Sequence, residues 1–196
     1  KAIGRVLAVQ AIGGQYLPDW HPWEDYHAMY SSRVALGGGV LWDSHDMDYL
    51  TWLAGPLSAV SCRTARTRTL DIETEDLACA LLTFKSGAQG TLQMDYLQRP
   101  YARRVHVTGS LGTVVWEYPE GAVRHYHADD KTWRTYPVPE GYELNQMYVD
   151  EMRHFLQCVT DRKQTITSLS QARHVLMVLD RARASSEKGG VQMDIA

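Results

Sequence analysis

The sequence predicts an α+β fold, in which an open, mostly antiparallel β-sheet carries helices on one face. Strand-like segments separated by short turns fill the middle of the chain, and two helical patterns follow near its end. Runs of strands followed by runs of helices are typical of α+β domains. The 196 residues, 44% of them hydrophobic, suffice for one well-buried core, so we expect a single domain over residues 1–196.

The chain opens with an apolar run and continues with an aromatic segment. Residues 6–12 read VLAVQAI and end at Gly13 and Gly14, which predicts a strand. Residues 15–30 hold tyrosines, tryptophans and prolines without a regular period, so we expect an ordered aromatic loop there. Loops of this length without secondary structure are often functional.

A helix is expected after three consecutive glycines. Gly37, Gly38 and Gly39 interrupt the chain, and apolar residues then recur every three to four positions over residues 41–54. Gly55, followed by a proline, ends the pattern.

Short strands and two further helices make up the rest of the prediction. The ranges predicted as strands are 58–67, 76–84, 88–97, 103–108, 113–118, 122–127 and 132–136. The helices are expected over 144–160 and 170–186, with Ser170 as the N-cap of the second and Gly189 with Gly190 as its stop. Helices can cover only one face of such a sheet, so we expect homo-oligomer contacts through the other face.

Composition argues against several functional classes. The formal charge of -3 gives no broad basic surface for a nucleic acid, and no stretch approaches the ~18 to 20 apolar residues of a membrane span. Three widely spaced cysteines without a CxxC pair indicate free thiols in a reducing, cytoplasmic environment. His125 and His127 share one face of a predicted strand but lack a third ligand nearby, so we expect no metal site.

The helix after the glycines carries the best candidates for proton transfer. His45 and Asp48 lie three residues apart and therefore share one helix face. A histidine whose charge is stabilised by a carboxylate can take the proton of an alcohol. The alternative is that both residues only cap the helix or link it to a neighbouring strand.

The segment GGGVLWDSHDMDYLTWLAGP resembles the helix that follows the glycine-rich turn in the Gfo/Idh/MocA oxidoreductases. The resemblance continues through further segments over about residues 3–193. These segments are GRVLAVQAIGGQYLPDWHPWEDY, EDLACALLTFKSGAQGTLQMDYLQRP, VTGSLGTVVWEY and YVDEMRHFLQCV, which are similar to successive parts of that family's C-terminal domain.

The resemblance implies a two-domain enzyme. Its N-terminal Rossmann domain would bind NAD or NADP, and its C-terminal domain would supply substrate contacts and the oligomer interface. This sequence has no GxGxxG after a strand and no Glu-Lys-Pro motif. We therefore expect the chain to be the C-terminal half alone, with a Rossmann domain as its partner.

The resemblance also implies roles for particular residues. His45 is the expected catalytic acid or base, and Asp48 is the carboxylate that matches the family pattern. Asp43 is assigned to substrate contact, although many members carry an aspartate four residues before the histidine and Asp43 lies only two before it. Gly38 and Gly39 are assigned to close contact between backbone and cofactor.

Further substrate contacts are expected from the aromatic loop and from an arginine. Tyr16, Trp20 and His21 have the aromatic faces and polar tips that suit a sugar-like ligand, or else they form a packed structural loop. Arg99, in a group with Arg103 and Arg104, is a candidate for an anionic substrate group, or else belongs to a solvated face or a subunit salt-bridge network.

The expected function is that of an NAD(P)-dependent oxidoreductase acting on a secondary alcohol of a sugar, nucleotide sugar or cyclitol. Catalysis would require the Rossmann domain, because hydride transfer needs the cofactor that this domain holds. The alternative is a non-catalytic ligand-binding or assembly module with the same open-sheet fold.

Overall fold

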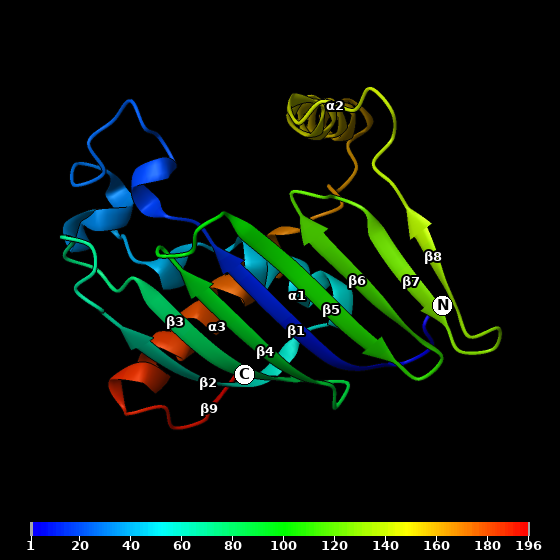
Figure 1. The fold of residues 1–196 in the computed structure, drawn as a ribbon, viewed down its shortest axis with the longest axis horizontal. Coiled ribbons are helices and arrows are strands. Elements are labelled where there is room, and N and C mark those ends of the chain that lie inside the picture. Colours follow the sequence, from blue (N-terminus) through cyan, green and yellow to red (C-terminus); the bar gives the residue numbers. More distant parts are fainter. Residues whose placement is uncertain (1, 196) are drawn as a thin grey trace.

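The structure is a computed structural model that describes residues 2–195, and these residues form a nine-stranded open sheet with the order β8-β7-β6-β5-β1-β4-β3-β2-β9 (Figure 1). Only the β1–β4 pair is parallel among the described strands, which confirms the predicted fold class. The strands are β1 (Val6–Gly14), β2 (Leu57–Ala65), β3 (Leu77–Phe84), β4 (Gln89–Asp95), β5 (Ala102–Gly109), β6 (Gly112–Tyr118), β7 (Val123–His127), β8 (Thr132–Tyr136) and β9 (Met193–Asp194). The α-helices are α1 (His45–Ala54), α2 (Asn145–Asp161) and α3 (Leu169–Glu187).

The first strand lies in the middle of the sheet. β1 pairs with β5 on one side in the antiparallel direction and with β4 on the other in the parallel direction. A parallel pair needs a long crossover connection, and the chain between β1 and β4 supplies one that includes α1. The carboxyl ends of β1 and β4 therefore meet at one edge of the sheet.

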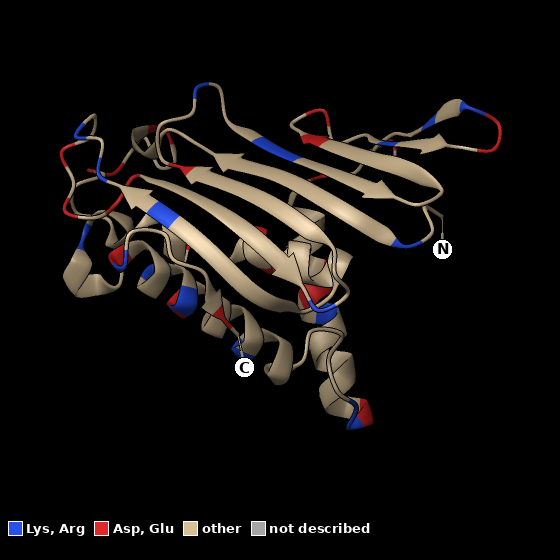
Figure 2. Ribbon diagram, turned by 90° about the horizontal axis from the view of Figure 1, so that it is seen from below, with Lys and Arg blue, Asp and Glu red and all other residues tan. Residues whose placement is uncertain are grey.

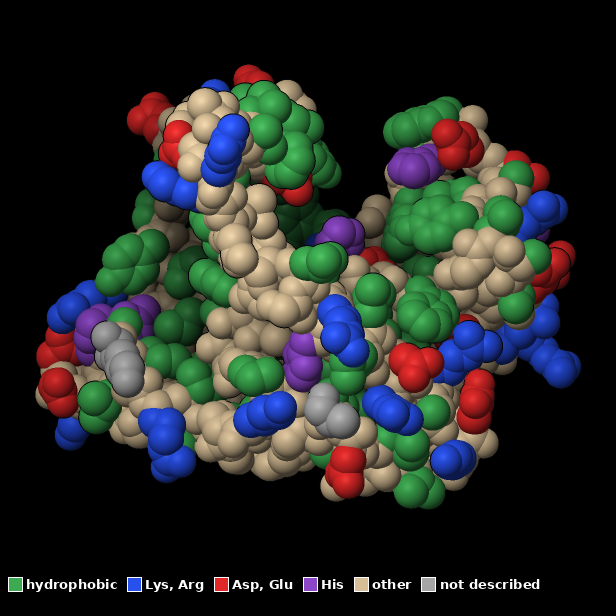
Figure 3. Space-filling view, turned by 180° about the vertical axis from the view of Figure 1, so that it is seen from behind, with side chains coloured by type: hydrophobic (Ala, Val, Ile, Leu, Met, Phe, Trp, Pro, Cys, Tyr) green, Lys and Arg blue, Asp and Glu red, His purple; other side chains and the backbone are tan. Residues whose placement is uncertain are grey.

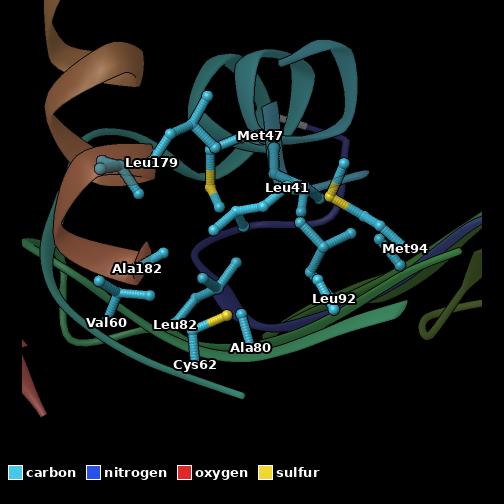
Figure 4. Close-up of a cluster of buried hydrophobic side chains, with 14 of the residues drawn as sticks. Leu41, Met47, Val60, Cys62, Ala80, Leu82, Leu92, Met94, Leu179 and Ala182 are labelled. Carbon is cyan, nitrogen blue, oxygen red and sulfur yellow. The ribbon is translucent and has the colours of Figure 1, made fainter. Parts of the chain in front are cut away.

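Two helices cover one face of the sheet, as Figure 2 shows from below. Met47 of α1 and Leu179 of α3 are fully buried against Val60, Leu82 and Leu92 of the strands (Figure 4). Each such side chain contributes roughly 1.5–3 kcal/mol when it leaves water. This layer fixes the position of α1, whose first residue is His45.

The remaining helix, α2, lies apart from the sheet (Figure 1). The expectation that both terminal helices cover the sheet is wrong for α2, because Cys158 is its only buried residue. α2 carries a stripe of apolar side chains, which are exposed and do not form core. These residues are Met152, Phe155, Leu156 and Val159, with Met147, Tyr148 and Val149 beside them.

Several element boundaries differ from the prediction for local reasons. α1 begins at His45 and not near residue 41, because Val40–Trp42 form a separate 3-10 turn and Asp43 is extended. The N-cap of α3 is Ser168 and not Ser170, since the Ser168 side chain accepts a hydrogen bond from the Gln171 amide in a capping box. The short strand β9 was not predicted. Between β1 and α1, as expected, only isolated 3-10 turns interrupt the loop.

The face of the sheet opposite α1 and α3 carries many polar side chains. Gln10, Thr91 and Gln93 alternate with buried neighbours and line a shallow hollow there, next to the exposed Leu81. The homo-oligomer expected through this face stays a prediction. None of the helices within residues 2–195 is both long and apolar enough to cross a membrane.

A histidine of α3 holds the start of β2. Nε2 of His174 accepts a hydrogen bond from the Leu57 amide at 3.0 Å, so that nitrogen must be unprotonated. Burial, with a smaller contribution from Lys85, lowers the pKa of His174 below its ordinary value. The unfolded chain takes up this proton near pH 6.5, whereas the folded chain takes it up only at lower pH. The stability gained from neutral His174 is therefore present above about pH 6.5 and is lost as the pH falls through the folded-state pKa.

Acidification is expected to destabilise the wild-type chain more than a His174→Gln variant. The variant has no titrating group at this position, so its melting temperature should fall less between about pH 7 and about pH 5. Thermal unfolding of both proteins across that range measures the difference. Parallel curves for the two proteins would show that His174 is not the titrating group.

Candidate functional site

A polar cleft of about 380 Å³ lies where the carboxyl ends of β1 and β4 meet the start of α1. On the helix side of the molecule, Figure 3 shows a hollow between α2 and the segment of residues 15–36. β1, the aromatic loop, α1, β5 and α2 all contribute side chains or backbone to the cleft. Its lining includes Gly13, Gly14, Trp20, His21, Asp43, His45, Asp46, Asp95, Tyr101, Arg103 and Tyr148.

His45 stands at the mouth of the cleft. As the first residue of α1 it leans back toward the preceding turn, because helical side chains point toward the helix N-terminus. Its Nε2 lies 3.8 Å from Oδ1 of Asp43, and its side chain is 77% exposed while that of Asp43 is 20% exposed. The imidazole can therefore meet a ligand from the open side with a carboxylate behind it.

The carboxylate beside His45 is that of Asp43 and not that of Asp48. Among the described residues no ion pair joins His45 to Asp48, and Asp48 does not line the cleft. The shared helix face that the spacing predicts does not bring these two side chains into contact.

A buried ion pair forms the floor of the cleft. Asp46 is 1% exposed, and its Oδ2 accepts a hydrogen bond from Nη2 of Arg103 on β5 at 3.1 Å. The Tyr49 hydroxyl donates to the other carboxylate oxygen. Gly13 permits this arrangement, because a Cβ atom there would lie 2.5 Å from Oδ2 of Asp46. The β1 backbone, α1 and β5 are thus joined around one carboxylate.

Burial shifts the pKa values of Asp46 and Tyr49 at the bottom of the cleft. It raises the pKa of Asp46 above its ordinary value, and the Arg103 guanidinium opposes that rise by stabilising the ionised carboxylate. Burial, reinforced by the negative charge of Asp46, also raises the pKa of Tyr49. Tyr49 therefore remains a neutral hydrogen-bond donor to Asp46.

The substrate-contact residues expected from the aromatic loop divide into two groups. Trp20 and His21 line the cleft, and the Trp20 ring meets Tyr96 edge-on at 5.3 Å between centroids. Tyr16 lies outside the cleft, with the Arg99 guanidinium 3.3 Å over its ring. Such a cation–π contact occupies one face of the Tyr16 ring.

The two glycines assigned to cofactor contact pack against this chain itself. A Cβ atom on Gly38 would lie 2.1 Å from the Tyr30 carbonyl oxygen, and one on Gly39 would lie 2.2 Å from the Glu75 carboxylate. Gly39 also has a φ of +119°, which side-chain-bearing residues rarely adopt. Both glycines are buried and neither lines the cleft, so close packing within the chain accounts for them.

Asp46 was not predicted as a site residue, and Arg103 was named only in a group with Arg99 and Arg104. The signal for Arg103 is the alternation of Arg103, Val105 and Val107, which places the arginine on the core face of β5 while Arg104 faces the other way. The signal for Asp46 is its spacing of four residues from the buried Leu50. The contribution of Tyr148 has no comparable local signal.

The glycine pair between β5 and β6 does not form a pyrophosphate site. The turn between β5 and β6, where Gly109 and Gly112 lie close in sequence, connects two antiparallel strands and leads into no helix. Dinucleotide phosphates are typically held by a glycine-rich turn at a helix N-terminus, which this turn lacks. Within residues 2–195, no three histidine, cysteine or acidic side chains come together as metal ligands.

The fold and cleft define an α+β domain with a polar cleft beside an exposed histidine. Residues 1–115 match the family model described as the GFO/IDH/MocA C-terminal domain. This match covers more than half of the sequence, so the chain belongs to that family, which confirms the resemblance.

Solved structures of oxidoreductases share the fold over nearly the whole chain. Levoglucosan dehydrogenase in complex with NADH and levoglucosan is 19% identical, with a TM-score of 0.85 over 99% of this chain and 60% of its own. An NAD binding oxidoreductase from Klebsiella pneumoniae is 15% identical, with a TM-score of 0.87 over 100% of this chain and 60% of its own. Aldose-aldose oxidoreductase from Caulobacter crescentus, complexed with glycerol, is 22% identical, with a TM-score of 0.80 over 98% of this chain and 56% of its own.

The chain thus spans about three fifths of the length of these proteins, and at such identities the likeness shows the fold. A comparison with curated protein sequences gave no match.

Proposed function

We propose that this chain is the substrate-binding and oligomerisation domain of an NAD(P)-dependent oxidoreductase. The reaction is hydride exchange between the cofactor and a secondary alcohol of a sugar, nucleotide sugar or cyclitol. The observation that carries the proposal is the exposed imidazole of His45 at a polar cleft, backed by Asp43. Family membership and the oxidoreductases with the same fold support it.

In this proposal His45 moves the proton. The His45 imidazole takes the hydroxyl proton of the substrate as the carbon loses its hydride, and Asp43, 3.8 Å from Nε2, stabilises the imidazolium that forms. Asp48, in the first turn of α1, adds negative charge near the same end of the helix. Trp20 and His21 border the space that the sugar ring would occupy.

The cofactor is held by a Rossmann domain that acts with this chain. When bound, NAD or NADP accepts or returns the hydride. The chain's own residues bind and orient the alcohol, hold its proton and complete the wall of the cleft.

The test is an assay of the two domains together. This chain, joined to a family Rossmann domain or mixed with one, is offered NAD or NADP and a panel of neutral sugars, nucleotide sugars and cyclitols. Formation of reduced cofactor, followed by its absorbance, is the expected result. Sugar binding without reduction across the panel would instead favour a non-catalytic binding module.

NAD or NADP is expected not to stabilise the isolated 196-residue chain, because the glycine pair between β5 and β6 does not form a pyrophosphate site. A real site at 100 times its dissociation constant would add about 2.7 kcal/mol, which raises the melting temperature of a domain of this size by several degrees. Thermal unfolding with millimolar cofactor measures the shift. A rise of several degrees would contradict the assignment of the cofactor to another domain.

Self-association is expected through the face of the sheet that α1 and α3 leave open. The exposed Leu81 and the hollow beside it lie on that face. Light scattering at micromolar concentration should give a mass at least twice that of the chain. A strictly monomeric mass would contradict this role of the sheet.

A further inference from the structure

The charges that line the cleft are unevenly divided. Within the described lining there are three carboxylates, those of Asp43, Asp46 and Asp95, one guanidinium, that of Arg103, and two imidazoles, those of His21 and His45. Asp46 already neutralises Arg103 through their buried ion pair. The carboxylates of Asp43 and Asp95 therefore leave the cleft with an excess of negative charge.

The cleft has both a hydrogen-bond acceptor and hydrogen-bond donors that the protein itself leaves unused. The Asp95 carboxylate accepts bonds from the backbone amides of Leu97 and Gln98 and is 5% exposed. Asp43 is the more open carboxylate and is free to accept from a ligand hydroxyl. Two buried donor nitrogens at the cleft, Nε of Arg103 and Nε1 of Trp20, have no hydrogen-bond partner among the described residues.

We infer that the Asp46–Arg103 pair selects a neutral polyhydroxy substrate and rejects substrates with a carboxylate or phosphate group. A hydroxyl group both donates and accepts, so it can donate to Asp43 and accept from a donor in the cleft wall. An anionic group can only accept, and it would meet the excess negative charge with no lysine or second arginine in the described lining to pair with. This inference rests on the proposed function and narrows its substrate class.

Asp46 acts in this selection as a positioning residue. It holds the Arg103 guanidinium at the floor and cancels its charge, while Arg103 lines the cleft with a side chain that is 23% exposed. Without the Asp46 charge, the same guanidinium would become an anion-binding group, since arginine pairs readily with carboxylates and phosphates.

Matched sugars test the selection directly on this chain. D-glucose and D-glucuronate differ by a carboxylate at one carbon, and their binding is followed by NMR shifts of cleft residues at pH 7 and matched ionic strength. Wild-type protein is expected to bind glucose at least about tenfold more tightly, a ratio that one unfavourable charge contact can supply. Glucuronate binding as tight as glucose binding, or tighter, would overturn the inference and leave a sugar-binding cleft in place.

Variants separate selection from simple stability. Asp46→Asn keeps the shape of the side chain but removes its charge, so the preference should move toward glucuronate by at least about tenfold. Asp180→Asn, the same change on the exposed side of α3, should leave the preference unchanged. If Asp46→Asn does not fold, Asp43→Asn tests the same preference, because it removes an accessible carboxylate without breaking the buried pair. Its preference should also move toward glucuronate.

The outcomes are distinct for the two proposals. A folded Asp46→Asn or Asp43→Asn protein that keeps the wild-type preference overturns charge selection. Absence of binding for both sugars, up to the highest concentration that the protein tolerates, overturns this inference, whereas the assay of the two domains together decides the proposed function. Oxidation of neutral sugars with an unchanged preference in the variants would leave the proposed function standing and remove only the selection by charge.

Discussion

Replacing His45 with alanine is expected to lower kcat by about 10² to 10⁴ fold in the enzyme formed by this chain and a Rossmann domain, the usual contribution of a positioned acid or base. The loss falls on kcat because the imidazole receives the proton only as the reaction proceeds. Cofactor affinity should hardly change, since in the proposed enzyme the Rossmann domain would hold the cofactor. The side chain is 77% exposed, so its removal should leave the melting temperature almost unchanged.

Steady-state kinetics and thermal unfolding of the same preparation measure both effects. His106→Ala is the matched control, because His106 is an exposed histidine of β5 that does not line the cleft, and its kcat should stay at the wild-type value. Asp48→Asn should cost less than His45→Ala, because the proton acceptor remains. Normal turnover with a lowered melting temperature in His45→Ala would end the catalytic assignment and favour a helix-linking histidine.

Replacing Arg103 with methionine is expected to destabilise the chain by about 3–5 kcal/mol, because it leaves the Asp46 carboxylate buried without its cation. Asp46 is 1% exposed and would retain only the Tyr49 hydroxyl as a side-chain partner. For a domain of this size such a loss lowers the melting temperature by roughly 6 to 20 °C. Chemical unfolding in urea measures the free energy directly.

Arg104→Met is the matched control for this prediction. Arg104 is the next residue of β5, faces the opposite side of the sheet and pairs with Glu117 at 3.6 Å while 58% exposed. Surface pairs of this kind contribute about 0–1 kcal/mol. If the free energy of unfolding falls by the same amount in both variants, the Asp46–Arg103 pair stabilises the fold no more than a surface pair does.

The sheet was predictable because turns and alternation are local signals. Seven strand segments and the opening strand were located from glycine-containing turns and apolar runs, and the structure contains a strand at each. The exposure of α2 was not predictable in this way. An amphipathic pattern reports that a helix has an apolar side, but not whether that side meets the sheet of the same chain, and in α2 it does not.

The site was only partly predictable for a similar reason. His45 was singled out because it follows a glycine-rich segment at a helix start. The structure places it in the lining of the cleft, and its catalytic role stays a prediction. The sequence predicted Asp48 as the carboxylate beside His45. The structure places Asp43 there instead, because the helix begins at His45 and its side chain points back toward the preceding turn. The contact between Asp46 and Arg103 joins α1 to β5 across β1, and no local spacing in the sequence reports it.

The central position of β1 has a consequence for the folding kinetics of the chain. The strands β2, β3 and β4 pair with one another in sequence order, as do β5, β6, β7 and β8, so each set can form from nearby residues. β1 precedes the other strands in the chain, yet it pairs Ala8 with Gln89 and Val9 with Val107, so it must wait for both sets. Closing contacts between distant residues slows folding. Insertion of β1 between the two sets should therefore be the late, rate-limiting event, and the cleft at its carboxyl end should be among the last parts of the molecule to form.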